Sequence, residues 1–121
     1  MQDDARTIAE AKEIVRRFCE ERDWDQYHNP KDLAVGMVTE GSELLEIFRF
    51  MTDTQQAELL AEAKSREHIE DELADTLFFV LRFAQMNDID LFSALEDKIA
   101  KNDAKYPADK VRGCNRKYDE Y

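Results

Sequence analysis

Two pairs of acidic residues have types and spacing that could do chemistry. Glu40 and Glu43 form one pair, and Glu72 and Asp75 form the other. At 100° per residue, Glu40 shares a helix face with a set of mostly apolar residues: Leu33, Met37, Leu44, Ile47 and Met51. Glu72 shares its face in the same way with Ile69, Thr76, Phe79 and Phe83. A carboxylate on the apolar face of a helix indicates a cationic partner, because an unpaired buried charge is costly.

If the two helices pack face to face, all four carboxylates would converge on one point. Two like charges about 4 Å apart repel by roughly 4 kcal/mol at an effective dielectric of about 20, and burial adds to that cost. The alternative is that the pairs are solvated helix faces. With 28 acidic residues in 121, pairs at this spacing arise often by chance, so the spacing alone is weak evidence.

A site built only from carboxylates favours a hard cation, Mg²⁺ or Mn²⁺. Zinc is disfavoured because no His or Cys accompanies the pairs, and a di-iron site needs Glu-x-x-His, which neither His28 nor His68 provides. If the ligand is a polyphosphate, the cation could neutralise it and polarise the attacked phosphorus. A carboxylate not fully used as a ligand could then take a proton from water.

Length and composition predict one all-α domain, with a core over residues 4–107 and a polar tail over residues 108–121. The 121 residues include only three Gly and two Pro, while 37% are charged. Cys19 and Cys114 match no metal motif and are expected to be reduced thiols. No apolar leader or membrane-spanning stretch is evident, so we expect a soluble cytoplasmic protein.

Charge is segregated along the chain. The net charge of -11 argues against a nucleic-acid or membrane partner. Residues 98–117 nevertheless hold seven Lys or Arg against two Asp. Among them, Lys98, Lys101 and Lys105 have helical spacing and could meet phosphate charge, or could equally form a solvated helix face.

Apolar periodicity and capping residues predict five helices. Asn29 and Pro30 provide a cap and a first-turn proline for the second helix, while Asp90 can cap the fifth. The expected ranges are about 4–22, 30–51, 55–63 and 65–86, with the last from 90 to a point before Pro107. Leu91, Leu95 and Ile99 mark the expected core stripe of the fifth helix.

Two features of these helices indicate close packing. Gly36 and Gly41 lie inside the second helix, where each costs up to about 1 kcal/mol relative to Ala, so a close neighbour is expected at both. The helix over residues 65–86 is apolar on most sides, because one face carries Phe79 and Phe83 and the opposite face carries Leu73, Leu77 and Leu81. A second subunit is expected to cover that face.

Three stretches of the chain resemble the MazG-like nucleoside triphosphate pyrophosphohydrolases, and most resemble their dCTP pyrophosphatase branch. They are RDWDQYHNPKDLAVGMVTEGSELLEIFRF, IEDELADTLFFVLRFA and KIAKNDAKYP, and they run from about Phe18 to Pro107. The resemblance includes ExxE and ExxD in order with 28 residues between them, which is more specific than either pair alone.

The resemblance implies an antiparallel four-helix core. It also implies assembly into a homotetramer, built as a dimer of dimers, or at least into a homodimer. It implies cleavage of a deoxynucleoside triphosphate to a monophosphate and pyrophosphate, in nucleotide-pool cleansing. Glu40, Glu43, Glu72 and Asp75 would hold Mg²⁺, for which Mn²⁺ could substitute, and one of them would help to activate water. Near the end of the last core helix, the implied phosphate and sugar contacts are Asn102, Lys105 and Tyr106, and Lys98 is added to the expected substrate contacts from its place on the basic helix face.

The resemblance also implies a base pocket of Trp24, as a stacking wall, and His28, as a polar contact. Phe50 stands where the dCTP branch usually has a second Trp, which keeps an aromatic face but loses an N–H donor. Each of the three also has a structural alternative as a core or loop residue. Three functions stay open: a hydrolase preferring dCTP or modified dCTP, a broad dNTP or dUTP hydrolase, and a non-catalytic metal-binding interaction module.

Overall fold

The structure is a computed structural model that describes residues 1–115, and every regular element in this range is a helix. The predicted all-α class is confirmed. The chain divides into two compact units, Met1–Asp88 and Ile89–Tyr121, and each is described by itself. The single domain expected from the sequence therefore stays a prediction.

The first unit begins with a short 3-10 turn, η1 (Gln2–Asp4), followed by α1 (Ile8–Glu20). Helix α1 starts later than predicted because Thr7 and Glu10 form a capping box, in which the Thr7 hydroxyl accepts from the Glu10 backbone N–H at 3.1 Å. A second 3-10 turn, η2 (Asp25–Tyr27), occupies the predicted break.

Helix α2 (Pro30–Phe48) begins where the sequence predicts. The Asn29 side chain accepts from the Asp32 backbone N–H at 2.9 Å, and Pro30 fills the first turn. The helix ends three residues before the predicted Met51. The chain leaves it at Arg49, and Phe50 has a φ of 65°, the left-handed conformation that closes a helix end.

Capping also sets the bounds of the next two helices, α3 (Asp53–Ala61) and α4 (Ala63–Met86). Thr52 and Gln55 form a capping box at the start of α3. At α4, the Glu62 side chain accepts from the backbone N–H groups of Lys64 and Ser65, at 3.0 and 2.9 Å. Both helices therefore start two residues earlier than predicted.

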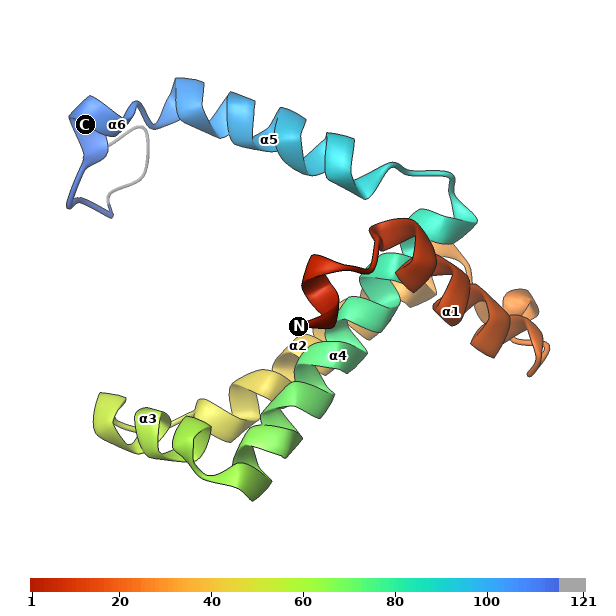
Figure 1. Cartoon of the computed structure of the whole chain (residues 1–121), viewed down its shortest axis with the longest axis horizontal. Helices are drawn as coiled ribbons and strands as arrows, with labels where there is room; N and C mark the ends of the chain where they lie inside the picture. Colours follow the sequence, from red (N-terminus) through yellow and green to blue (C-terminus); the bar gives the residue numbers. More distant parts are fainter. Residues whose placement is uncertain (116–121) are drawn as a thin grey trace. The chain divides into compact units, whose positions relative to one another are not determined.

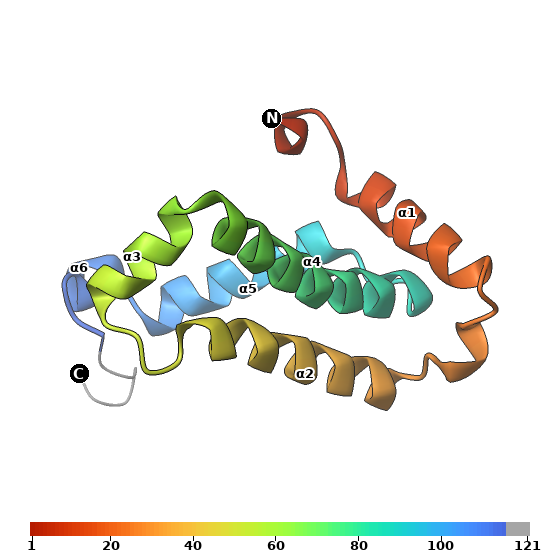
Figure 2. The same cartoon turned by 90° about the horizontal axis from the view of Figure 1, so that it is seen from below.

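Helix α4 is the element against which the rest of the first unit packs. Figures 1 and 2 both show α2 and α4 side by side and antiparallel, and α1 and α3 also contact α4. The buried apolar residues come from three helices: Val15, Cys19, Leu33, Ile69, Leu81 and Ala84. This packing places the first acidic pair, on α2, opposite the second, on α4.

Gly36 explains how closely α2 and α4 approach. A Cβ atom built on Gly36 would lie 2.5 Å from ring carbons of Phe79, so only glycine fits without moving that ring. Gly41 differs, because a Cβ there meets nothing within 4 Å among the described residues. The expected close neighbour exists at Gly36 and is not found at Gly41 within the chain.

We expect opposite effects from two matched substitutions in α2. Gly36→Ala should lower the free energy of unfolding by about 1–3 kcal/mol because it overpacks the contact with Phe79. Gly41→Ala should raise it by up to about 1 kcal/mol through helix propensity alone. Urea unfolding of both variants measures this, and a stabilised Gly36→Ala variant would contradict the close packing seen here.

The second unit contains α5 (Leu91–Lys105) and the short α6 (Ala108–Val111). Asp90 caps α5 as predicted, accepting from the Ser93 backbone N–H at 2.9 Å, and the helix ends before Pro107. Part of the predicted polar tail is thus helical, and its last residues, 116–121, lie outside the described residues.

Apolar side chains remain exposed on helices of both units. Leu73 and Leu77 on α4 are exposed, as expected of the face assigned to another subunit, whereas Leu81, assigned to the same face, is buried within the chain. Leu95 and Ile99 on α5 are also exposed, so the predicted core stripe of that helix is not buried within the chain. None of the helices in the described part of the chain is long and apolar enough to cross a membrane.

Candidate active site

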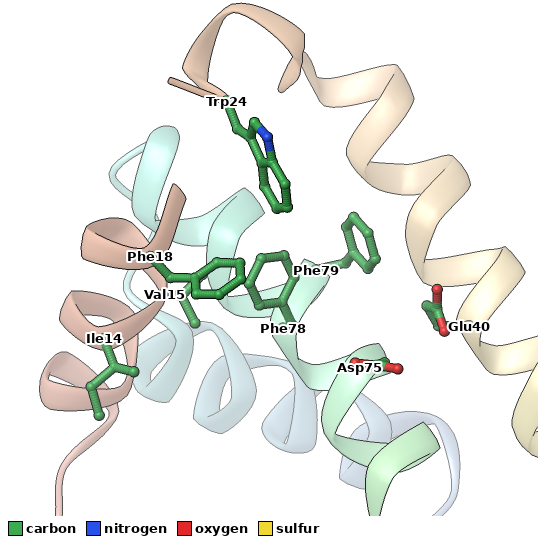
Figure 3. A pocket seen from close by; sticks show the side chains of 8 residues that line it. All are labelled: Ile14, Val15, Phe18, Trp24, Glu40, Asp75, Phe78 and Phe79. Atoms are coloured by element: carbon green, nitrogen blue, oxygen red, sulfur yellow. The ribbon is translucent and has the colours of Figure 1, made fainter. Parts of the chain in front are cut away.

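Three carboxylates converge between α2 and α4. Ligand oxygens of Glu40, Glu43 and Glu72 all lie within 4.8 Å of one another, and together these residues are called the acidic cluster below. Asp75 is not part of this group. Its carboxylate faces the same space as that of Glu40, from α4 (Figure 3). The structure therefore brings three of the four predicted ligands together and leaves Asp75 beside them.

The acidic cluster contains two buried carboxylate oxygens without a hydrogen-bond partner, Glu40 Oε2 and Glu72 Oε2. The Glu72 side chain is only 14% exposed, while Glu43 and Asp75 are exposed. The burial predicted from helical phase, with Glu40 and Glu72 as the inner members, is confirmed. A buried acceptor without a donor is unfavourable unless a ligand satisfies it.

Electrostatics within the acidic cluster oppose ionisation. Burial raises the pKa of Glu40 above its usual value of 4.5, and the nearby charges of Glu43 and Asp75 raise it further. Burial likewise raises the pKa of Glu72, together with the close Glu43 carboxylate and Asp75. His68, whose Nε2 lies 3.5 Å from Glu72 Oε1, acts in the opposite direction. A bound cation would remove this repulsion.

A pocket of about 400 Å³ extends from the carboxylates to an aromatic wall (Figure 3). Its carboxylates are Glu40 and Asp75, and its other walls are apolar side chains from α1, α4 and the loop before η2. The apolar lining residues are Ile14, Val15, Phe18, Trp24, Phe78 and Phe79. The arrangement suits a ligand with an anionic end, held through a cation, and a flat apolar end.

The aromatic wall is a continuous series of edge-to-face contacts. Ring centroids are 5.5 Å apart for Phe18 and Trp24, 5.9 Å for Phe18 and Phe78, and 5.3 Å for Phe78 and Phe79. Phe79 in turn meets Gly36 across the helix contact. Such contacts give the wall a defined shape.

Trp24 lines the pocket, whereas His28 does not, and the stacking role of Trp24 stays a prediction. The His28 ring stands against the edge of Trp24, with centroids 6.2 Å apart, and its Nδ1 accepts a hydrogen bond from Arg82 Nε at 2.9 Å. His28 thus supports Trp24 in this structure, and its predicted contact with the base stays a prediction.

Phe50 is not brought to this pocket within the chain. It follows the end of α2, while Trp24 and His28 precede its start, and 19 helical residues span roughly 28 Å. The Phe50 side chain is 90% exposed and lies under the Arg49 guanidinium, 4.7 Å from the ring centroid. The predicted joint pocket of these three residues is therefore not found in a single chain.

The predicted phosphate and sugar contacts all belong to the second unit. Lys98, Asn102 and Lys105 lie on α5, at spacings that place them on one helix face. Lys101 lies on the same helix, and Tyr106 follows it, its backbone N–H donating to the Asn102 carbonyl at 2.8 Å. Of the predicted basic region, Arg116 and Lys117 lie outside the described residues. The roles of these side chains stay predictions.

The structure adds three residues that sequence reasoning did not select. Phe18 and Phe78 form the centre of the aromatic wall, and Arg82 is fully buried beside it. The signal for Arg82 was a charged residue within the most apolar stretch of the chain, between Leu81 and Phe83.

Comparisons with known proteins agree with this architecture. The model of the MazG-like family matches residues 38–121. The chain is 32% identical to human dCTP pyrophosphatase 1 over 114 residues, covering 94% of this chain and 67% of the relative, and the mouse protein of that name gives the same values. It is also similar to a crystal structure of a pyrophosphatase from Archaeoglobus fulgidus, with TM-score 0.76 and 37% identity, over 82% of this chain and 91% of that chain.

Proposed function

Because this chain belongs to the MazG-like family and is a nucleotide pyrophosphohydrolase, we propose that it cleaves dCTP to dCMP and pyrophosphate with Mg²⁺ as cofactor. One observation carries this proposal: the acidic cluster holds two buried, unsatisfied carboxylate oxygens, and one of its members, Glu40, lines the pocket with the aromatic wall. A nucleoside triphosphate has the matching parts, a polyphosphate that carries its own cation and a flat base.

The residues present fit Mg²⁺. The donor set is entirely carboxylate oxygen, which this hard cation prefers, and the two orphaned oxygens of Glu40 and Glu72 need a positive partner. Glu43 completes the acidic cluster, and Asp75 lies close enough to affect the pKa of both buried members. When bound, Mg²⁺ would supply charge neutralisation of the phosphates and acidification of water.

Side chains of the protein are proposed to accept the proton, to stack on the base and to bind the phosphate and sugar. Glu43 and Asp75 are the exposed carboxylates of the site, so an attacking water can reach either of them, and one of the two is proposed to accept its proton. Trp24 offers a flat wall for the base. Lys98, Asn102, Lys105 and Tyr106 are proposed to contact phosphate and sugar, and all four lie in the C-terminal half of α5 or directly after it.

Base choice is the least constrained part of the proposal. Apart from the two carboxylates and the indole N–H of Trp24, the side chains lining the pocket are apolar, so they can stack on a base but offer few hydrogen bonds to it. A pocket with few such bonds discriminates weakly between bases. This observation favours the second candidate, a broad dNTP or dUTP hydrolase with the same cleavage chemistry.

A homo-oligomer, with a tetramer as the expected form, is proposed from the exposed apolar side chains. Leu73 and Leu77 on α4 and Leu95 and Ile99 on α5 are all more than half exposed in the chain alone. Burying apolar surface stabilises association by about 25 cal/mol per Å² before association costs. The cytoplasmic location and the pool-cleansing role stay predictions.

Product analysis tests the proposed reaction. Incubation with dCTP and Mg²⁺, followed by phosphorus NMR, is expected to show dCMP and pyrophosphate. Orthophosphate release would place the attack at another phosphorus, and no hydrolysis of any dNTP would leave only a metal-binding role. A comparison of kcat/KM across dCTP, dTTP, dUTP, dATP and dGTP then separates the two candidates, because similar values for all five would favour the broad hydrolase.

A further inference from the structure

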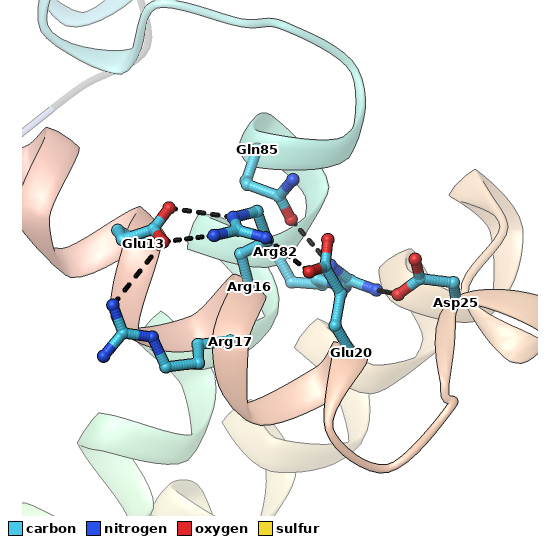
Figure 4. A network of polar contacts seen from close by, with 7 residues as sticks. All are labelled: Glu13, Arg16, Arg17, Glu20, Asp25, Arg82 and Gln85. Carbon is cyan, nitrogen blue, oxygen red and sulfur yellow. Dashed lines mark hydrogen bonds and ion pairs between the residues drawn. The ribbon is translucent and has the colours of Figure 1, made fainter.

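Arg82 is a fully buried arginine on α4 whose side chain makes three polar contacts. Its Nε donates to His28 Nδ1 at 2.9 Å and its terminal nitrogens donate to Gln85 Oε1 at 2.6 Å and to Asp25 Oδ1. Figure 4 shows the contacts with Gln85 and Asp25 and, beside them, the separate ion pairs of Arg16 on α1. Nothing in the proposed chemistry uses this buried guanidinium.

Two of these contacts cross from α4 to the segment that carries Trp24. Asp25 and His28 lie at the two ends of the turn η2, directly after Trp24 in the chain. They are 57 and 54 residues away from Arg82 in sequence, so the contacts are tertiary and not helix-internal. A buried guanidinium that donates hydrogen bonds from several nitrogens of its rigid, planar group fixes the geometry of the groups it binds. Arg82 therefore holds both ends of this turn.

Trp24 is also held by contacts with residues near it in the chain, among them the hydrogen bond that its carbonyl accepts from the Tyr27 backbone N–H at 2.9 Å. Its backbone N–H donates to the Cys19 carbonyl at 3.0 Å, and its ring meets Phe18 on one side and His28 on the other. Trp24 is 37% exposed, so packing alone encloses it only in part. The His28 ring, which Arg82 orients, is thus a main support of the indole.

The same contact determines the state of His28. Arg82 Nε is always a donor, so Nδ1 must be an acceptor and the ring proton must reside on Nε2. Burial lowers the pKa of His28, and the nearby Arg82 charge lowers it further, while Asp25 opposes the change. The imidazole is consequently neutral with one defined tautomer.

We propose that Arg82 is a positioning residue that holds the η2 turn and the neutral Nε2–H form of His28, and thereby sets Trp24 as the wall against which the substrate base stacks. For its substrate this inference rests on the proposed function. Its structural part does not, because the orientation of Trp24 and the tautomer of His28 are properties of the protein without ligand.

The test uses Arg82→Met, which keeps an unbranched side chain but removes all three contacts, with Arg66→Met as the matched control on the same helix. Arg66 is exposed and pairs only locally, with Glu70 and the Leu60 carbonyl. Because Trp24 is the one tryptophan of the chain, intrinsic fluorescence reports on this site alone. Nitrogen-15 NMR of the imidazole reports the tautomer of His28.

Arg82→Met is expected to shift the Trp24 emission to longer wavelength and to turn the His28 signals into those of exchanging tautomers. Base stacking on an aromatic side chain is worth about 1–3 kcal/mol, so KM for the preferred dNTP should rise about 10-fold while kcat changes less than about 3-fold. Arg66→Met should change none of these signals. An equal fall in kcat and kcat/KM would place Arg82 in the chemistry and overturn a positioning role.

Asp25→Asn guards against the case in which Arg82→Met does not fold. Asp25 is 51% exposed, so this change weakens the contact without emptying a buried site. A smaller rise in KM, in the same direction, is expected. Unchanged Trp24 and His28 signals in the folded variants overturn the inference, whereas a wild-type protein that hydrolyses no dNTP overturns the proposed function and leaves the spectroscopic result to decide the role of Arg82.

Discussion

Glu72→Gln is expected to lower kcat/KM for the preferred dNTP by at least about 100-fold while the helical fold is retained. The substitution keeps the shape of the side chain and removes its negative charge. A bound metal ion supplies several kcal/mol of charge stabilisation in the transition state. A loss of about 2.7 kcal/mol corresponds to a 100-fold fall in rate. Loss of one buried ligand is enough to forfeit that much. Glu40→Gln, the other buried member, should behave in the same way.

The structure separates this expectation from a general loss of stability. The Glu72 oxygen without a partner lies in a cluster of like charges, so a neutral amide relieves repulsion with Glu40 and Glu43. Circular dichroism and thermal denaturation should therefore show a fold at least as stable as the wild type in the absence of metal. Unfolding of both variants would instead assign the acidic cluster a structural role.

Matched controls lie within one turn of Glu72 on the same helix. Glu70→Gln removes an exposed charge that pairs with Arg66, and Asp71→Asn removes a second exposed charge. Neither control residue belongs to the acidic cluster or lines the pocket. The controls should retain activity within about 2-fold, since isolated surface charges have small effects. A large loss in Glu70→Gln would show that net charge, and not ligation, governs the rate.

The sequence predicted helix identity well and helix ends less well, for a physical reason. Periodicity of apolar residues identifies an amphipathic helix, but its ends are set by side chains that compete for the first free N–H groups. Asn29 and Asp90 are strong caps and were recognised. Glu62 accepts two backbone N–H groups at α4, a use of glutamate that propensity does not signal.

In the candidate site, too, the features that follow from local helix geometry were predicted and those that depend on tertiary packing were not. Helical phase correctly singled out Glu40 and Glu72 as the buried acids, because phase follows from local geometry alone. The relative depth of Asp75 depends on how two helices slide and rotate against each other, which the sequence does not encode locally. Phe50 was grouped with Trp24 by resemblance, yet the length of α2 separates them within one chain.

Arg82 is the clearest example of a site residue whose contacts could not be predicted from the sequence. Its partners Asp25 and His28 are more than 50 residues away, and only the folded chain brings them together. In the sequence Arg82 interrupts an apolar stretch, which marks it as unusual but does not name its partners. Contacts of this kind follow from tertiary packing, where spacing patterns carry no information.

Mg²⁺ is expected to raise the free energy of unfolding of the protein. The rise should be larger at a pH where the carboxyl groups of the acidic cluster are ionised than at a pH where they are protonated. Ligand present at 100 times its dissociation constant raises the free energy of unfolding by about 2.7 kcal/mol. Glu40 and Glu72 have pKa values raised above 4.5, so at low pH they are protonated and must release protons to bind the cation. Mg²⁺ should therefore add little stability near pH 4.5 and its full effect near pH 8.

In the metal-free protein, the contribution of Glu40 and Glu72 to the free energy of unfolding should change with pH in the opposite direction. Because their pKa values are raised, the folded state binds more protons than the unfolded chain between 4.5 and the raised values, so their contribution to stability falls as pH rises through that interval. Thermal denaturation with EDTA and with excess Mg²⁺, at several pH values, measures both effects.

The stability of Glu72→Gln should be less sensitive to pH without metal, and this variant should lose most of the stabilisation by Mg²⁺. Glu70→Gln should keep that stabilisation. A full Mg²⁺ shift in Glu72→Gln would place the cation elsewhere, because a site that needs the buried Glu72 oxygen cannot bind normally without its charge.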